Sequence, residues 1–221
     1  MHDSPILIVI IIAVFIIIIA YSMYFSKEAV VRRKLRSMEG KRISDFQSGE
    51  VAKVKGSIKY VGDTLTAPLS GRKCAFYHVL VEERRSNGKN SHWVTIIEEE
   101  IASTLIIKDG NSYALIETKM IKNYLLEDAQ YSSGFLNDAS ETLQSYLKKH
   151  DRDSVSWIGL NNAIRYKEGI LEEGELIAVT GKGNWKRKSE IKLDIPAEKI
   201  LVIGAHDNEP VYFSDDPVVL E

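Results

Sequence analysis

The sequence predicts an N-terminal transmembrane helix followed by a mainly-β domain, an antiparallel barrel with one or two inserted helices. Three observations lead to this fold class. Residues 6–25 are uncharged and mostly aliphatic. Most later apolar segments are short, rich in β-branched or aromatic residues, and separated by turn-forming residues, as strands are. One amphipathic helix pattern lies near Leu143. An OB-like barrel is the specific form we expect.

The apolar run at residues 6–25 is long enough to cross a bilayer, because a helix of that length spans about 30 Å. A cleaved signal peptide is the alternative. Against it, the run has no basic residues before it, exceeds the ~7 to 15 residues of a signal core, and has no small-x-small cleavage site before the basic cluster. We therefore expect a permanent membrane anchor.

Basic residues follow the span but do not precede it. Residues 1–5 contain no Lys or Arg. Because positive charge stays on the cytoplasmic side, we expect a short N-terminus outside the cell membrane and a cytoplasmic domain. The basic residues either only fix this orientation or also contact anionic headgroups. The membrane-proximal basic residues are Lys27, Arg32, Arg33, Lys34 and Arg36.

The rest of the chain suffices for one compact domain. We expect a basic linker at residues 26–45, a β-rich domain at 46–205 and a tail at 206–221. Beyond residue 42 the chain has 22 basic and 28 acidic residues, a net charge of about −6. This acidic balance argues against general nucleic-acid binding.

The strand pattern is clearest where turn chemistry bounds it. Asp109-Gly110-Asn111 predicts a tight hairpin, because these residue types tolerate positive φ. Residues 86–90 predict a polar hairpin tip. After Cys74, alternation would place Phe76 and His78 on the same face as Cys74. The expected strands cover residues 51–60, 74–83, 92–101, 104–108, 113–117, 163–166, 176–183, 191–195 and 200–203.

The helix is expected to start in a capping box formed by Asp138 and Glu141. Lys148 and Lys149 would close its last turn favourably for the helix dipole. Its apolar face would carry Leu136, Ala139, Leu143, Tyr146, Leu147 and His150.

No catalytic, metal or cofactor site is predicted from residue patterns. Cys74 is the only cysteine, so a RING or zinc ribbon with four or more ligands cannot form. Cys74 and His78 would lie ~13 Å apart on a strand, too far for a nucleophile and its base. Ser70 lacks a nucleophile elbow. Glu98, Glu99 and Glu100 could supply metal ligands, but adjacent strand residues point to opposite faces, which favours a solvated surface.

The segment from Gly181 to Lys188 combines glycine, tryptophan and basic residues. As a phosphate cradle it lacks the P-loop and GxGxxG spacings, and a hairpin turn explains it more simply. Its tip could still contact lipid headgroups or an oligonucleotide. The candidate binding residues are Trp185, Lys186, Arg187 and Lys188.

Several segments together resemble a known family. After a membrane span come VKGSIKYVGDTLTAPLSGRKCAFYHVLVEER, TLIIKDGNSYALIE, the helix near Leu143 and RYKEGILEEGELIAVTGKGNW. Over residues 51–203 they resemble the GIDE or BAM (beside-a-membrane) domain of MAPL-type membrane-anchored E3 ubiquitin ligases and their prokaryotic relatives. The turn positions that carry the resemblance are Pro68, Ser70, Gly71, Glu173, Gly174 and Glu175.

The resemblance implies a membrane-proximal module that binds partners, here in a prokaryote. The eukaryotic ligases continue into a second span and a RING, where the ligase activity resides. With one cysteine in this chain, that activity cannot be carried over.

The expected function is therefore a single-pass, membrane-anchored, non-catalytic module that binds a protein partner or small ligand. One alternative is a membrane-tethered enzyme, or a transferase subunit dependent on a partner RING. A pocket that joins His78 or His92 to Glu98 or Asp109 would favour an enzyme. A second alternative is an anionic-lipid or nucleic-acid binder that uses the Trp185 tip.

Overall fold

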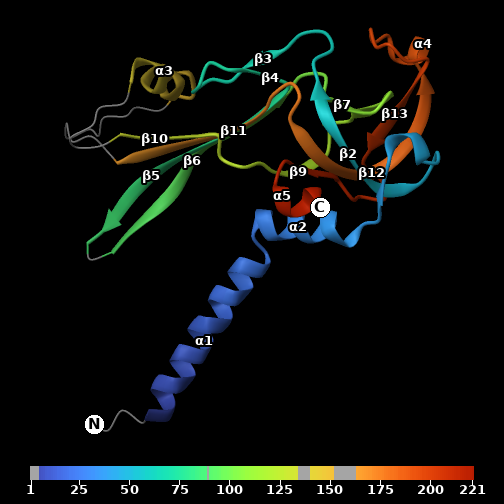
Figure 1. The fold of residues 1–221 in the computed structure, drawn as a ribbon. Coiled ribbons are helices and arrows are strands. Elements are labelled where there is room, and N and C mark those ends of the chain that lie inside the picture. Colours follow the sequence, from blue (N-terminus) through green and yellow to red (C-terminus); the bar gives the residue numbers. More distant parts are fainter. Residues whose placement is uncertain (1–4, 89, 134–139, 152–162) are drawn as a thin grey trace.

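The computed structural model describes residues 5–88, 90–133, 140–151 and 163–221 (Figure 1). The chain forms a closed β-barrel, a four-stranded sheet beside it, and a long helix α1 (Pro5–Tyr24) that projects away from both. The prediction of a mainly-β domain behind an apolar N-terminal helix is confirmed.

Helix α1 makes almost no contact with the folded domain. Its segment Leu7–Tyr24 has a mean hydropathy of 3.0, and none of it is buried within the protein. Among the described residues it is the one helix long and apolar enough to cross a membrane.

Helix α2 (Lys27–Ser37) occupies the region expected to be a linker. Ser26 caps it by accepting a hydrogen bond from the Ala29 N–H at 3.2 Å. Val31 and Leu35, one helical turn apart, are fully buried against the C-terminal part of the domain. The surrounding charges conceal this short apolar stripe in the sequence. After it, β1 (Gly40–Lys41) pairs with the barrel, so the folded unit begins well before residue 46.

Five strands close the barrel. The order runs β2, β7, β8, β13, β12 and back to β2. The β8–β13 pair is parallel, and the other four pairs are antiparallel. The strands are β2 (Val51–Lys59), β7 (Ile106–Asp109), β8 (Ser112–Ile116), β12 (Leu176–Arg187) and β13 (Lys199–Gly204).

The barrel interior is a single apolar cluster, to which β2 contributes Val54 and β13 contributes Ile203. Near one end, a Cβ on Gly183 would lie 2.4 Å from the ring of Phe46, so only glycine lets that ring pack there. The Asp109 hairpin forms as predicted, with Gly110 at a φ of 58°.

Two further strands extend the barrel sheet beside β12. These are β14 (Val211–Ser214) and β9 (Ile121–Tyr124), followed by the short α5 (Pro217–Leu220). Residues 206–221, expected to be a tail, thus form part of the folded domain. Every residue of β14 is buried.

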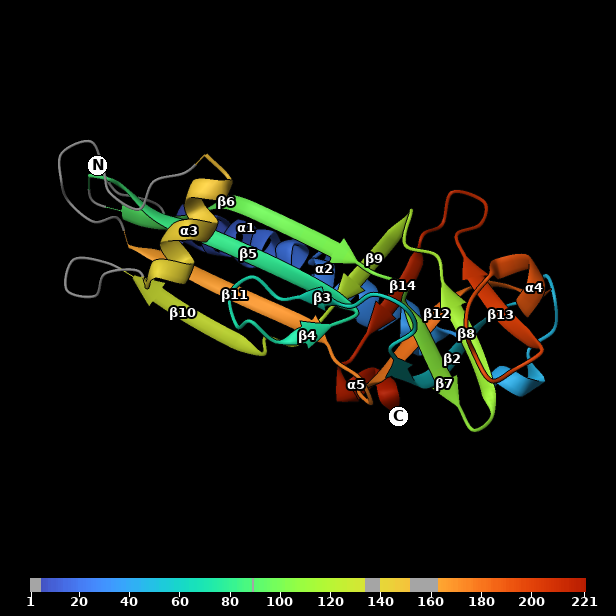
Figure 2. The ribbon, with the colours of Figure 1, turned by 90° about the horizontal axis from the view of Figure 1, so that it is seen from above.

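The second lobe is an antiparallel sheet ordered β10, β11, β5, β6. Helix α3 (Glu141–Lys149) and the β3–β4 pair cover one face of it, where Leu147 and Tyr166 are fully buried (Figure 2). The other face lies on the side of α1 (Figures 1 and 2). The strands are β3 (Leu65–Thr66), β4 (Lys73–Cys74), β5 (Phe76–Asn87), β6 (Asn90–Ala102), β10 (Ala129–Ser133) and β11 (Ile164–Leu171).

Three local predictions differ from the structure. The chain bends at Ala75, so Cys74 packs with Tyr77 on the covered face, whereas His78 lies on the opposite face. Residues 191–195 form no strand, because α4 (Lys188–Ile191) reverses the chain there. Consequently the segment from Gly181 to Arg187 is part of β12 and not a hairpin turn.

The predicted helix is present, but its start differs from the prediction. Ser140 is the N-cap and accepts a hydrogen bond from the Leu143 N–H at 3.4 Å. Asp138, together with Leu136 and Ala139, lies outside the described residues.

Candidate functional site

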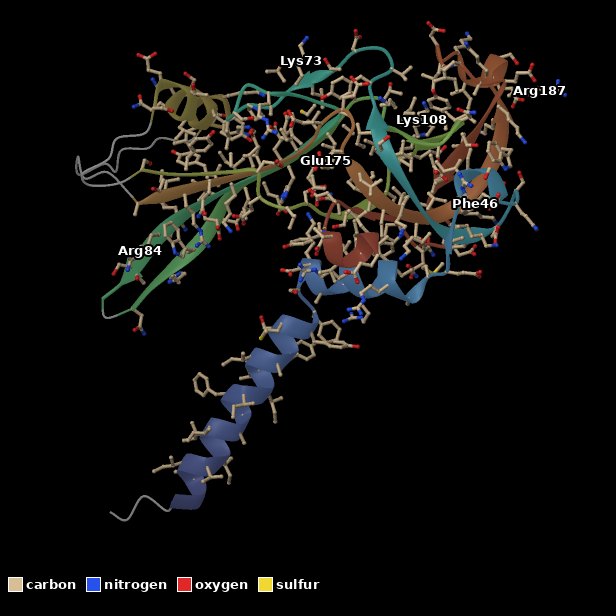
Figure 3. All side chains as sticks on the ribbon, in the orientation of Figure 1. Phe46, Lys73, Arg84, Lys108, Glu175 and Arg187 are labelled. Carbon is tan, nitrogen blue, oxygen red and sulfur yellow. The ribbon has the colours of Figure 1, made fainter. Side chains whose placement is uncertain are left out.

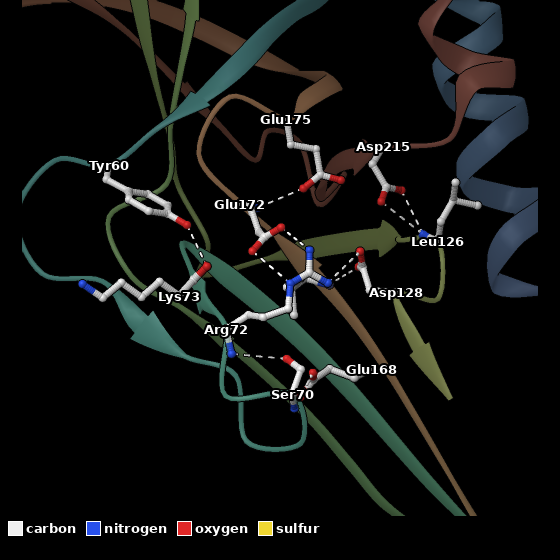
Figure 4. Close-up of polar contacts among 11 residues, drawn as sticks. Tyr60, Ser70, Arg72, Lys73, Leu126, Asp128, Glu168, Glu172, Glu175 and Asp215 are labelled. Atoms are coloured by element: carbon white, nitrogen blue, oxygen red, sulfur yellow. Dashed lines mark hydrogen bonds and ion pairs between the residues drawn. The ribbon is translucent and has the colours of Figure 1, made fainter. Parts of the chain in front are cut away.

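A polar network joins the barrel to the four-stranded sheet (Figure 4). We call it the junction cluster; it comprises Arg72, Asp128, Glu168, Glu172, Glu175 and Asp215. It brings together the two turns that carried the family resemblance. Figure 3 shows Glu175 between the two lobes.

The first turn, at residues 67–72, lies before β4. The Gly71 N–H donates to the Ala67 carbonyl at 3.0 Å, and Gly71 has a φ of +72° that favours glycine. Pro68 lies within this turn, and the Ser70 hydroxyl accepts the Arg72 N–H at 3.4 Å. Ser70 is thus part of the turn's own hydrogen bonding.

Glu168 fixes this turn to β11. Its carboxylate is fully buried and accepts the N–H groups of Leu69 at 2.8 Å and Ser70 at 3.0 Å. A charged acceptor satisfies two backbone donors that have no strand partner. The sequence offered no signal for this role, because the donors lie 98 and 99 residues away.

Arg72 links the first turn to the second turn and to the loop before β10. Its guanidinium donates to both carboxylate oxygens of Glu172 and lies 3.5 Å from Asp128. Asp128 also accepts the Ile170 N–H at 2.8 Å. The hydrogen bond to Glu172 raises the pKa of Arg72 above its usual value.

The second turn, at residues 172–175, attaches to the barrel. Gly174 has a φ of +89°, and its N–H donates to the Ile58 carbonyl at 2.9 Å. Glu175 accepts the Glu172 N–H at 2.9 Å, and burial raises the pKa of Glu175 above its usual value. The Glu173 side chain points elsewhere and pairs with Lys59 at 3.4 Å.

Asp215 completes the junction cluster from the segment after β14. Both of its carboxylate oxygens accept the Leu126 N–H, at 2.9 and 3.2 Å. Burial raises the pKa of Asp215 to about 7 despite this hydrogen bond. The residue lies in the predicted tail, and no motif or spacing in the sequence indicated a role for it.

The junction cluster is suited to holding two lobes together and to taking up a proton near neutral pH. Three of its carboxylates, Asp128, Glu168 and Asp215, accept backbone N–H groups from other segments. The nearby Cys74 thiol is fully buried, and burial raises its pKa to about 11. It is therefore protonated at neutral pH and unsuited to nucleophilic attack.

The membrane-proximal basic residues are mostly paired inside the protein. Arg32 forms an ion pair with the buried Asp216, and Lys34 pairs with Glu209 at 3.1 Å. Arg33 stacks on Tyr24 at the end of α1, 4.1 Å from the ring centroid. These contacts fix α2 between the span and the barrel.

The predicted basic tip lies away from the membrane helix. Trp185 donates its indole N–H to the Phe46 carbonyl at 2.8 Å, and the Lys199 ammonium lies 4.5 Å from the Trp185 ring centroid. Trp185, Arg187 and Lys199 line an open groove of about 460 Å³. Figure 3 places Arg187 at the end of the barrel distant from the long N-terminal helix, where Figure 1 shows α4. Lipid contact at this tip is therefore disfavoured.

The residues named for an enzymatic alternative are only partly brought together. His78 Nε2 lies 3.3 Å from Glu98 Oε1 and lines a cavity of about 150 Å³. Burial and, secondly, the charge of Lys27 lower the pKa of His78. His92 lies near the tip of the β5–β6 hairpin, and Asp109 lies in the β7–β8 hairpin, and neither residue lines this cavity.

Comparisons with known proteins find no relative of this chain. No protein-family model, curated protein or solved structure matches this chain.

Proposed function

We propose that this chain is a single-pass membrane protein whose cytoplasmic domain binds a protein partner or small ligand near the bilayer, without chemistry of its own. The observation that carries the proposal is the contrast between α1 and α2. Helix α1 exposes an uncharged and mostly apolar surface, whereas α2 directly after it is packed onto the barrel. Lipid would cover the apolar surface of α1 without the free-energy cost of exposing it to water. Helix α2, packed on the barrel, then holds the domain beside that lipid.

The orientation in the membrane is part of the proposal. The basic side of the span stays in the cytoplasm according to the positive-inside rule. Arg33, stacked on Tyr24, marks that end of the span, where aromatic and basic side chains prefer the headgroup level.

The outer edge of β6 is the surface we propose for a protein partner. Among the described residues, this 13-residue strand pairs only with β5. Its free N–H and C=O groups can accept an added strand, which is a common mode of peptide recognition. Trp93 and Ile101, each 38% exposed, provide apolar contacts along β6.

We also propose that the barrel is OB-like and that the chain is a GIDE/BAM-type module without a RING. The OB-like assignment is supported by the five-stranded barrel, which the pairing of β2 with β12 closes. OB-folds bind ligands with the loop after their first strand, and here β3 to β6 emerge between β2 and β7. The GIDE/BAM-type assignment is supported by the junction cluster, in which the two motif turns come together.

Site-specific photocrosslinking in native membranes tests the proposed function. A crosslinking residue at Thr95, exposed on β6, should give a reproducible adduct with one partner. The same residue at Asn111, exposed in the β7–β8 turn, is the matched control and should not. Absence of an adduct at Thr95, together with turnover of a substrate by the purified chain, would contradict the proposal.

Membrane sidedness needs a separate measurement. In right-side-out vesicles, the domain should resist added protease, and it should become sensitive when the membrane is opened. Digestion in intact vesicles would place the domain outside.

A further inference from the structure

We propose that His78, Glu98 and Glu100 form a binding site for a divalent transition-metal ion such as Zn²⁺, on the sheet face that lies on the side of α1. We call these three residues the anchor-side triad. This site goes beyond the proposed binding function and shares no residue with the junction cluster.

Strand register brings the anchor-side triad together. Glu98 and Glu100 lie two residues apart on β6, so they share a face, while Glu99 points to the other side and accepts the Tyr146 hydroxyl. His78 on β5 lies directly opposite Glu100. One ligand atom from each member of the triad lies within 4.8 Å of the other two.

The donor set and spacing suit zinc. In a tetrahedral site with bonds of 2.0–2.1 Å, neighbouring ligand atoms lie about 3.3 Å apart. His78 Nε2 lies 3.3 Å from Glu98 Oε1 and 3.9 Å from Glu100 Oε1, so little movement is needed. An imidazole nitrogen beside two carboxylates favours zinc over Mg²⁺ or Ca²⁺, which prefer oxygen alone. Three protein ligands leave a position for water.

Lys27 occupies the position where the positive charge of a metal ion would be needed. Its ammonium lies 2.5 Å from Glu100 Oε1 and 3.6 Å from Glu98 Oε1. The two carboxylates are thus already arranged around a cation. The Lys27 side chain is 41% exposed, so it can withdraw into solvent when a divalent ion enters.

The adjoining cavity provides an independent observation. His78 and Lys27 line a space of about 150 Å³, and Asn123 forms part of the same wall. The Asn123 side chain is fully buried, yet neither its Oδ1 nor its Nδ2 has a hydrogen-bond partner among the described residues. Such a group calls for a water or ligand. A metal-bound water or small solute in this cavity would supply one.

The position of Lys27 gives the site a structural consequence. Lys27 is the first residue of α2 and follows α1 by three positions. Metal binding would release this basic side chain at the point where the span joins the domain. The Lys27 ammonium and the metal ion would therefore compete for the carboxylates of Glu98 and Glu100.

Titration of the untagged, metal-free full chain in detergent micelles with Co²⁺ tests the proposal. Visible absorption should show a saturable one-to-one complex that Zn²⁺ displaces and Mg²⁺ does not. His78→Ala should weaken binding about tenfold or more, as loss of metal-site contacts does. Lys27→Gln should instead bind several-fold more tightly, because the competing ammonium is gone. No misfolded variant would mimic this gain.

Two variants serve as matched controls. Glu99→Gln changes the neighbouring carboxylate that faces the opposite side, and His92→Ala removes an exposed histidine of the same hairpin. Both should bind Co²⁺ as the unaltered chain does. The proposal is overturned if the unaltered chain shows no saturable complex, if His78→Ala leaves the affinity unchanged, or if Lys27→Gln weakens binding.

Discussion

The junction cluster lies between the two lobes, whereas the anchor-side triad lies on the face of the four-stranded sheet on the side of α1, and the two groups use carboxylates differently. In the junction cluster, Glu168 and Asp215 accept backbone N–H groups from segments distant in sequence. In the anchor-side triad, Glu98 and Glu100 face a partly exposed ammonium and an imidazole. The fold fixes the backbone donors that bind the junction-cluster carboxylates, whereas the cation that faces the anchor-side-triad carboxylates can be exchanged. Buried carboxylates on backbone donors thus hold structure, and half-exposed ones around a cation are available for binding.

Glu168→Ala should lower the stability of the fold more than the other substitutions, if buried carboxylates on backbone donors hold the structure. It leaves the N–H groups of Leu69 and Ser70 without their acceptor, the first at a buried and the second at a partly buried position. We expect a loss of about 3 to 5 kcal/mol in the free energy of unfolding. Urea unfolding of the full chain in micelles, followed by tryptophan fluorescence, measures it. Glu168→Gln keeps one acceptor oxygen and should lose about half as much. A loss below about 1 kcal/mol for the alanine variant would remove Glu168 from its structural role.

Asp215→Asn should change how stability depends on pH. The folded-state pKa of Asp215 is raised from 3.8 to about 7, so between these pH values the folded chain holds a proton that the unfolded chain has released. Stability therefore falls as pH rises from about 4 to 7 and levels off above it, by up to about 4 kcal/mol. Burial raises the pKa of Glu175 in the same direction and adds to the effect.

The difference in unfolding free energy between the Asp215→Asn variant and the unaltered chain isolates the contribution of Asp215. Asp215→Asn keeps an oxygen for the Leu126 N–H but cannot ionise. Its unfolding free energy should vary less between pH 5 and 8 than that of the unaltered chain. Identical pH profiles for both would contradict the assignment.

Arg32→Ala tests an intermediate case. Asp216 accepts the Val218 N–H at 3.0 Å, as junction carboxylates do, but also faces the guanidinium of Arg32. The Asp216 side chain is only 2% exposed, while that of Arg32 is 32% exposed, so solvent screens part of the pair. We expect a loss of about 1 to 2 kcal/mol in unfolding free energy. Arg33→Ala, which removes a contact with Tyr24 outside the domain, is the control and should leave domain stability unchanged.

The parts of the fold visible in the sequence are those with local signals. The Asp109-Gly110-Asn111 hairpin follows from turn chemistry, and β2 and β13 follow from β-branched runs between turns. Strands β9, β10 and β14 were not predicted, because polar residues such as Asn123 and Ser214 weaken their apolar pattern. Helix α2 was missed because its buried stripe is only Val31 and Leu35.

The sites were harder to predict, because they depend on contacts between segments far apart in sequence. Alternation along β6 is enough to place Glu98 and Glu100 on one face, but only the register with β5 adds His78. Likewise, the motif turns could be identified from sequence, whereas Glu168, which holds one of them, is indistinguishable from a surface glutamate there. Long-range pairing decides which carboxylate is buried, and no local pattern encodes it.

Glu98→Gln and Glu100→Gln should have the smallest effect on stability and so sharpen the comparison. Their side chains are 50% and 26% exposed, and the Lys27 pair is screened by solvent. Each substitution should change the unfolding free energy by less than about 1 kcal/mol in the urea experiment used for Glu168. The same two variants should nevertheless lose Co²⁺ binding, which Glu168→Gln should retain. Large destabilisation by Glu98→Gln would mean that the anchor-side triad holds the fold as the junction cluster does, since a carboxylate kept for an exchangeable cation contributes little to folding.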